Sequence, residues 1–238
     1  MDLTFMPIIE LVLWGFISIY LGSLDIAGIN LATILLGGII FWDLLSQAQR
    51  AVSLAFLEDV WERNLLNIFV TPLRISEFLT SLMLVGLVRV VLVAIIMGAL
   101  AFAMYNFNLL MLGLSLIPFV ANLLIFGWSL GIFTTAIVMR YGTSAQILSF
   151  VFILLVQPFS AVFYPVSALP SAVQFISYLL PPTYVFEGMR AVIAGAGFPV
   201  EELVYGFLTN LIYLGLTCWF FSYIFARVKE RGLLLKID

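Results

Sequence analysis

The chain has 238 residues, of which 64% are hydrophobic and only 10% are charged, and its mean hydropathy is +1.20. Soluble domains carry about 25% charged residues, and a single water-facing fold cannot hide this much apolar surface. Lipid must therefore solvate most of the chain. The sequence also has no basic patch of the kind that binding to nucleic acid requires, so we expect no such partner.

Histidine is absent, and Cys218 is the only cysteine. The sequence therefore predicts no transition-metal site, no intrachain disulfide and no histidine general base. Cys218 lies in an apolar run and is best interpreted as a small buried side chain. The N-terminus has neither a basic segment nor a small-residue cleavage site, so we do not expect a removable signal peptide.

A membrane-spanning helix needs about 20 apolar residues, and six segments approach or exceed that length. Their apolar runs are continuous, unlike the alternating strands of a membrane barrel. We therefore predict one all-α membrane domain over residues 1–238, with six transmembrane helices. The fourth span is long enough to tilt, or to kink at Pro118. The predicted spans are Met6–Leu24, Ile29–Leu45, Phe78–Tyr105, Leu109–Met139, Ile147–Phe163 and Val204–Phe225.

The basic residues predict the orientation of these spans. With six spans, all the basic loop residues except Arg190 fall on one side of the membrane. They are Arg50, Arg63, Arg74, Arg140, Arg227, Lys229, Arg231 and Lys236. Because cytoplasmic loops collect Lys and Arg, both termini are predicted to be cytoplasmic, in a cell (inner) membrane.

The long polar stretch Leu57–Phe78 lies between the second and third spans. Its apolar residues Trp61, Leu65, Ile68 and Phe69 recur at helical spacing, and charged and amide side chains cover the other faces. Pro72 ends this pattern, because the residue before a proline leaves the helical region. We expect a short amphipathic cytoplasmic helix, which either anchors the loop in the interface or docks to a partner. Its acidity favours docking, since lipid-binding helices are usually rich in Lys and Arg.

The segment Tyr164–Glu202 contains five prolines, and its apolar pieces Leu169–Leu180 and Tyr184–Ala194 are each too short to span a membrane. We predict a re-entrant helical hairpin, whose interrupted backbone must be satisfied by protein or by a wet cavity. The alternative is an interfacial loop on the outer leaflet. The residues assigned to this hairpin and its gate are Pro158, Pro165, Pro170, Pro182, Glu187 and Arg190.

Two pairs of charged residues stand out. Glu10 and Arg89 lie within predicted spans, where charges are costly and often pair. They either pair with one another or snorkel separately to the cytoplasmic side. Glu187 and Arg190 are three residues apart, on one helical face. They form either a solvated surface pair of little energetic value or a partly buried pair that braces the outer gate.

An ATP-binding P-loop requires the pattern G-x-x-x-x-G-K-[ST]. The only lysines, Lys229 and Lys236, follow Val228 and Leu235 and cannot belong to such a loop. We therefore expect this chain to bind no ATP and no other cofactor. If ATP drives its activity, ATP and Mg²⁺ must be bound by another polypeptide.

Three features together resemble a known family. The stretch ERNLLNIFVTPLRISEFL follows the second span, and Gln157–Ile193 reads QPFSAVFYPVSALPSAVQFISYLLPPTYVFEGMRAVI, with a P-T-x-x-x-E-x-x-R ending. The third feature is the order of six spans followed by a short basic tail. Over nearly its whole length, the chain is similar to the membrane subunit of a type-2 ATP-binding cassette (ABC-2) exporter. Family members usually begin with an amphipathic interfacial helix, whereas only Met1–Phe5 precede the first span here.

The resemblance implies a homodimer bound to two separate ATP-binding subunits, with the segment around Glu62–Leu73 as the coupling helix. We therefore predict the permease subunit of an ATP-driven exporter. It would move a hydrophobic or amphipathic substrate (a drug, lipid or glycan) out of the cytoplasm or inner leaflet at the dimer interface. The residues assigned to ATPase coupling are Trp61, Glu62, Arg63, Leu65, Phe69 and Pro72.

Two alternatives remain open, an intramembrane enzyme and a structural membrane scaffold. An enzyme would need polar groups that converge within the spans, and few are present. The candidates are Glu10, Arg89, Asn122, Gln146 and Gln157. The sequence does not specify the substrate. It also does not distinguish a homodimer from a heterodimer with a related permease.

Overall fold

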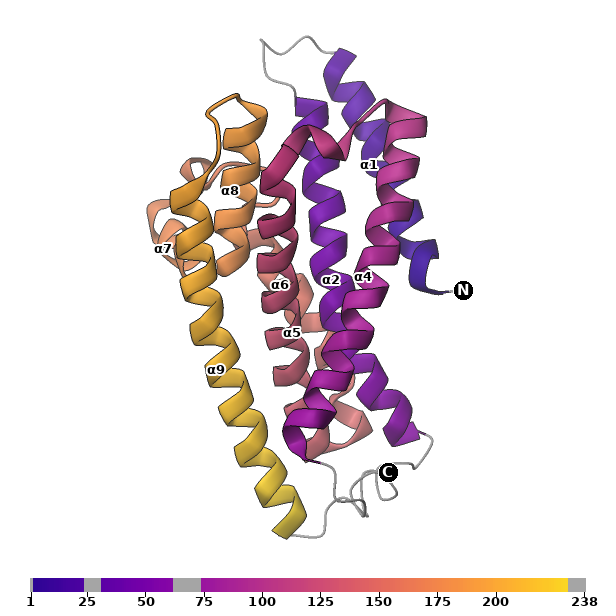
Figure 1. Cartoon of the computed structure of the whole chain (residues 1–238), viewed down its shortest axis with the longest axis vertical. Helices are drawn as coiled ribbons and strands as arrows, with labels where there is room; N and C mark the ends of the chain where they lie inside the picture. The colour runs from indigo at the N-terminus through magenta and orange to yellow at the C-terminus, as the bar shows by residue number, and fades with distance from the viewer. Residues whose placement is uncertain (1, 24–30, 62–73, 231–238) are drawn as a thin grey trace.

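The structure is a computed structural model that describes residues 2–23, 31–61 and 74–230, and every element in these ranges is helical (Figure 1). The all-α prediction is therefore confirmed for the described part of the chain. The long helices are α1 (Asp2–Ser23), α2 (Leu31–Trp61), α4 (Ile75–Tyr105), α5 (Leu116–Tyr141) and α9 (Val200–Glu230). The shorter elements are η1 (Leu109–Ser115), η2 (Thr143–Ala145), α6 (Leu148–Val156), η3 (Gln157–Phe159), η4 (Val166–Ala168), α7 (Ser171–Leu179) and α8 (Pro181–Ile193).

Helix α2 is the centre of the bundle. It packs against α5, α4 and α1, while α9 packs against α5 and α8. Residues 35–49 of α2 are all buried, although the outer helices expose many large apolar side chains, as expected of surfaces that face lipid. We call the end where α1 finishes and α2 begins, drawn at the top of Figure 1, the α1–α2 end. The opposite end, where α2 finishes and α4 begins, is the α2–α4 end.

Five described helical segments are long and apolar enough to cross a membrane: α1, α2, α4, η1 with α5, and α9. The predicted fifth span differs from these. Its helix, α6, has nine residues, and η3 extends the apolar helix only to Phe159. Pro158 lies in η3, where its ring removes a backbone donor that a continuing α-helix would use. Helix length therefore supports an all-α membrane protein, and a sixth crossing stays a prediction.

Two helix boundaries differ from the predicted ones for clear physical reasons. Helix α2 continues to Trp61 instead of ending near Leu45, because polar side chains such as Gln49 and Ser53 are buried against protein. The break in the predicted fourth span occurs at Gly113 (φ 56°, ψ −134°), not at Pro118. Pro118 lies in the first turn of α5, where a proline ring fits without breaking intrahelical hydrogen bonds.

Close packing of α2 on α5 depends on two glycines one helical turn apart. A Cβ atom built on Gly127 would lie 2.6 Å from the Cβ of Ala48, and one built on Gly131 would lie 2.7 Å from the Cβ of Val52. Small residues at this spacing let helix backbones approach closely in a membrane. The two helices therefore form one tightly packed unit in the middle of the bundle.

Candidate functional site

The hairpin predicted from the prolines is present as two short helices, α7 and α8, separated by Leu180 (Figure 1). Pro170 immediately precedes α7, and Pro181 and Pro182 occupy the first two positions of α8. A proline is well tolerated at these positions, because the first N–H groups of a helix have no intrahelical partner. Pro165 precedes η4 in the same way. The two helices are thus confirmed, and their depth in a bilayer stays a prediction.

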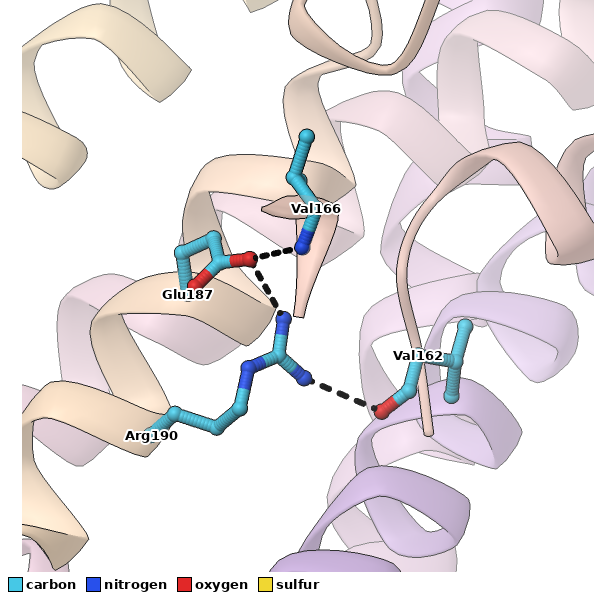
Figure 2. A network of polar contacts seen from close by, with 4 residues as sticks. All are labelled: Val162, Val166, Glu187 and Arg190. Carbon is cyan, nitrogen blue, oxygen red and sulfur yellow. Dashed lines mark hydrogen bonds and ion pairs between the residues drawn. The ribbon is translucent and has the colours of Figure 1, made fainter. Parts of the chain in front are cut away.

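Glu187 and Arg190 of α8 hold the segment that connects α6 to α7 (Figure 2). The Glu187 carboxylate accepts a 2.6 Å hydrogen bond from the Val166 backbone N–H, and its Oε1 lies 3.0 Å from Nη2 of Arg190. Arg190 Nη1 also donates to the Val162 carbonyl, at 3.4 Å. The Glu187 side chain is 30% exposed and the Arg190 side chain is 11% exposed. Of the two alternatives left open for this pair, the structure therefore supports the partly buried one.

The Val162 carbonyl lies between the hairpin and the bundle. A Cβ built on Gly38 of α2 would lie only 2.9 Å from this oxygen, so a larger residue there would displace it. Ala161, the preceding residue, is fully buried with a φ of 53°, a conformation that non-glycine residues rarely adopt. Gly37 similarly faces Met189 of α8, with 2.9 Å between a built Cβ and the sulfur atom. The hairpin therefore packs directly on α2.

Helix α1 contacts the same connecting segment. The rings of Trp14 and Phe163 stack with 4.1 Å between centroids and an interplanar angle of 19°. Stacked aromatic pairs add to the stability provided by burial alone. The segment after η3 is therefore held by α1, α2 and α8 together, near the α1–α2 end of the bundle.

Most residues predicted to couple to an ATPase cannot be placed. Glu62, Arg63, Leu65, Phe69 and Pro72 lie outside the described residues, and Trp61 is the last residue of α2. The start of the polar stretch is the end of α2 itself, because Phe56 and Leu57 are buried there. The ring of Phe56 meets that of Phe78 in α4 edge to face, with centroids 6.4 Å apart.

Glu10 is joined by a side-chain hydrogen bond to Asp43 of α2, and Arg50 lies close enough to interact with Asp43 electrostatically. Asp43 is only 2% exposed. Among the described residues no ion pair joins Glu10 to Arg89. Asp43 was missed by the sequence analysis, although it is a third charged residue within the predicted spans. Arg50 was assigned to a loop because α2 was expected to end earlier.

No hydrogen bond or ion pair in the described structure joins any two of the five residues named as candidates for an intramembrane enzyme. Asn122 of α5 bonds to Asn210 of α9, whose Nδ2 donates to the Asn122 side-chain oxygen at 3.0 Å. Gln146 and Gln157 lie at opposite ends of α6. The described residues also contain no group of His, Cys, Asp or Glu side chains that could hold a metal ion. A cavity of about 340 Å³ between α5 and α9 is instead lined mainly by apolar side chains, including Phe133, Tyr213 and Trp219.

A protein-family model described as ABC-2 type transporter matches residues 1–194. The chain belongs to the ABC-2 type transporter family. The matched region ends one residue after α8, so it includes the hairpin with Glu187 and Arg190. Comparison with curated proteins gives no match. As an ABC-2 family member, the chain is a multi-pass transport permease and is not itself catalytic. Permeases of this family normally work with an ATP-binding subunit.

Proposed function

We propose that this ABC-2 permease is the membrane half of an ATP-driven exporter, and that it works as a homodimer with two separate ATP-binding subunits. The observation that carries the proposal is the packing of the hairpin on α2: Gly37 faces Met189 of α8, and Gly38 faces the Val162 carbonyl, which accepts a hydrogen bond from Arg190. The far end of α2 leads directly into residues 62–73, the segment assigned to ATPase coupling.

The proposed mechanism is mechanical. ATP and Mg²⁺ would bind to the partner subunits, whose closure moves the segment containing Glu62, Arg63 and Leu65. Helix α2 has 31 residues, about 46 Å of helix, and so reaches from this segment to the hairpin. Because α2 is packed tightly on α5, the two would move together and shift the hairpin at the dimer interface. Substrate affinity changes only if the substrate binds the two states differently.

We further propose six membrane crossings in the cell (inner) membrane, with both termini cytoplasmic. In this arrangement α6 and η3 cross together with the chain that follows them, and the hairpin lies at the extracytoplasmic side. Arg74 at the start of α4, and Arg140 and Arg227 in the last turns of α5 and α9, lie at the α2–α4 end of the bundle, which supports this orientation. The mainly apolar cavity between α5 and α9 supports a hydrophobic or amphipathic substrate, of the drug, lipid or glycan class.

The decisive experiment is co-purification with an ATP-binding subunit captured from the native membrane, followed by ATP hydrolysis in lipid vesicles with candidate substrates. We expect a stable complex whose hydrolysis rises with one substrate class and whose vesicles accumulate that substrate. The matched control is the same ATPase without the permease. A permease that binds no ATPase, or whose complex moves no substrate of these classes, would favour the scaffold or enzyme alternatives.

A further inference from the structure

Gln49 of α2 forms a buried hydrogen bond to α6. Its side chain is 0% exposed, and its Nε2 donates to the backbone carbonyl of Ser149 at 2.9 Å. Nε2 also lies 3.3 Å from Oγ of Ser53, whose hydroxyl donates to the Gln49 carbonyl at 3.1 Å. Ser149 is the second residue of α6 and is 2% exposed. The bond therefore joins the central helix to the start of the segment that leads into the hairpin.

Two polar atoms at this contact have no hydrogen-bond partner: the Gln49 Oε1 and the Ser149 Oγ. Other buried hydroxyls, such as Ser129 and Thr135, donate to a carbonyl of their own helix, as is usual for Ser and Thr in membrane helices. Ser149 does not. Buried polar groups without a partner are uncommon and costly, so this pair requires a physical explanation.

The two unpartnered atoms are chemically complementary. The amide oxygen of Gln49 is an acceptor, and the hydroxyl of Ser149 is a donor that can rotate about its Cβ–Oγ bond. They belong to residues already joined by a hydrogen bond, so a change in the position of α6 relative to α2 can bring them together. The present bond and the new one use different atoms of the same two residues.

Helix α6 is the less extensively buried of the two helices in this contact. Helix α2 is held against α5 by the close approach at Gly127 and Gly131. In contrast, α6 has only nine residues, and its Leu154 and Leu155 are more than half exposed. Few buried apolar contacts mean that a displacement of α6 disrupts less packing than a displacement of α2.

We propose that Gln49 and Ser149 are positioning residues that hold α6 in two alternative arrangements on α2. In one, Gln49 Nε2 donates to the Ser149 carbonyl, as seen here; in the other, Ser149 Oγ donates to Gln49 Oε1. Switching between these two hydrogen bonds transmits the position of α2 to the hairpin during transport. This transmitting role rests on the proposed function. Neither residue contacts the substrate.

The test measures two properties of Ser149→Ala in the native and Gln49→Leu backgrounds. Since Ser149 Oγ makes no bond in the present arrangement, Ser149→Ala should change the melting temperature of the permease equally in both backgrounds. Transport should behave differently. Ser149→Ala should slow it by roughly two- to tenfold in the native background, the value of one neutral hydrogen bond, and leave it unchanged in Gln49→Leu. Ser149→Thr, which keeps the hydroxyl, should restore it.

Ser160→Ala is the matched control, because Ser160 is fully buried but its hydroxyl donates to the Val156 carbonyl of its own segment. Its effect on transport should not depend on Gln49. If Ser149→Ala slows transport equally in both backgrounds, the two-arrangement proposal is wrong. Background-dependent melting would also overturn it, because that result indicates a water bridging both atoms in the resting state. Absence of transport by the unmodified complex would instead count against the proposed function.

Discussion

Glu10 on α1 and Asp43 on α2 are hydrogen-bonded to each other inside the bundle. Two carboxylates this close to each other repel unless a nearby positive charge or a bound proton offsets them. Arg50, about two turns further along α2, supplies a positive charge near Asp43. The three side chains therefore form one electrostatically coupled group, in which Arg50 offsets negative charge in the low-dielectric interior.

This arrangement predicts energetic coupling between Asp43 and Arg50. Arg50→Gln should be more destabilising in the native permease than in the Asp43→Asn variant. In the native background it leaves the buried Asp43 without its counterion, whereas in Asp43→Asn that carboxyl group is already absent. We expect a coupling energy of about 0.5–3 kcal/mol in thermal or denaturant unfolding in detergent. Glu10→Gln with Arg89→Gln is the control pair, and its effects should be additive. Strong coupling in the control pair would show that Glu10 interacts with Arg89 instead.

Removal of the Glu187 carboxylate should loosen the hairpin. Glu187→Ala leaves the Val166 N–H and the Arg190 guanidinium without their acceptor, and we expect a loss of about 1–3 kcal/mol of stability together with slower transport. Glu187→Gln, which keeps an acceptor oxygen, should lose less. The control is Glu201→Ala, at an exposed position in the first turn of α9. Equal melting temperatures for Glu187→Ala and Glu201→Ala would contradict the bracing role.

The contact of α2 with α5 should not tolerate a larger residue. Gly127→Val places side-chain atoms against the Leu45 carbonyl and the Cβ of Ala48, and overpacking of this kind costs about 1–3 kcal/mol. Gly215→Ala in α9 is the control, because no atom lies within 4 Å of a Cβ built there. Thermal unfolding of both variants in detergent decides the matter. An unchanged melting temperature for Gly127→Val would mean that the two helices are not packed as tightly as described.

The proposed coupling segment predicts two different defects. Trp61→Ala should weaken binding of the ATPase by roughly 1–3 kcal/mol if Trp61 is an interface anchor. Glu62→Lys should leave binding largely intact and uncouple hydrolysis from transport, because rim charges mainly set orientation. Pull-down of the ATPase and size-exclusion behaviour of the permease measure these effects. Phe207→Ala, at an exposed aromatic residue on α9, serves as the control. Native binding and transport by both coupling variants would exclude a coupling role.

Orientation can be tested with single cysteines at positions 63, 201 and 231 in a Cys218→Ala background. We expect an impermeant thiol reagent to label position 201 in intact cells, and to label positions 63 and 231 only after lysis, because Lys and Arg concentrate on the cytoplasmic side. Labelling of position 63 but not of position 201 in intact cells would reverse the proposed topology.

The helices of this permease could be predicted because the signals that produce them are local. Continuous apolar runs needed a helical backbone in lipid, and the hairpin helices α7 and α8 overlap the predicted apolar pieces Leu169–Leu180 and Tyr184–Ala194. The family resemblance also follows from contiguous stretches, above all Gln157–Ile193, and the family match confirms it. None of these inferences depended on which helices are neighbours.

The contacts between helices were decided by the tertiary structure alone. The second span was predicted to end at Leu45, yet Asp43 and Gln49 are both buried in the longer helix α2, because α1 and α6 bring Glu10 and Ser149 to them. Gly113, not Pro118, breaks the fourth span, since a proline disrupts a helix only beyond its first turn. Hydropathy predicts whether a residue prefers lipid or water. It does not predict the partner on another helix that stabilises a buried polar side chain. That partner is selected by packing, which a single sequence does not display.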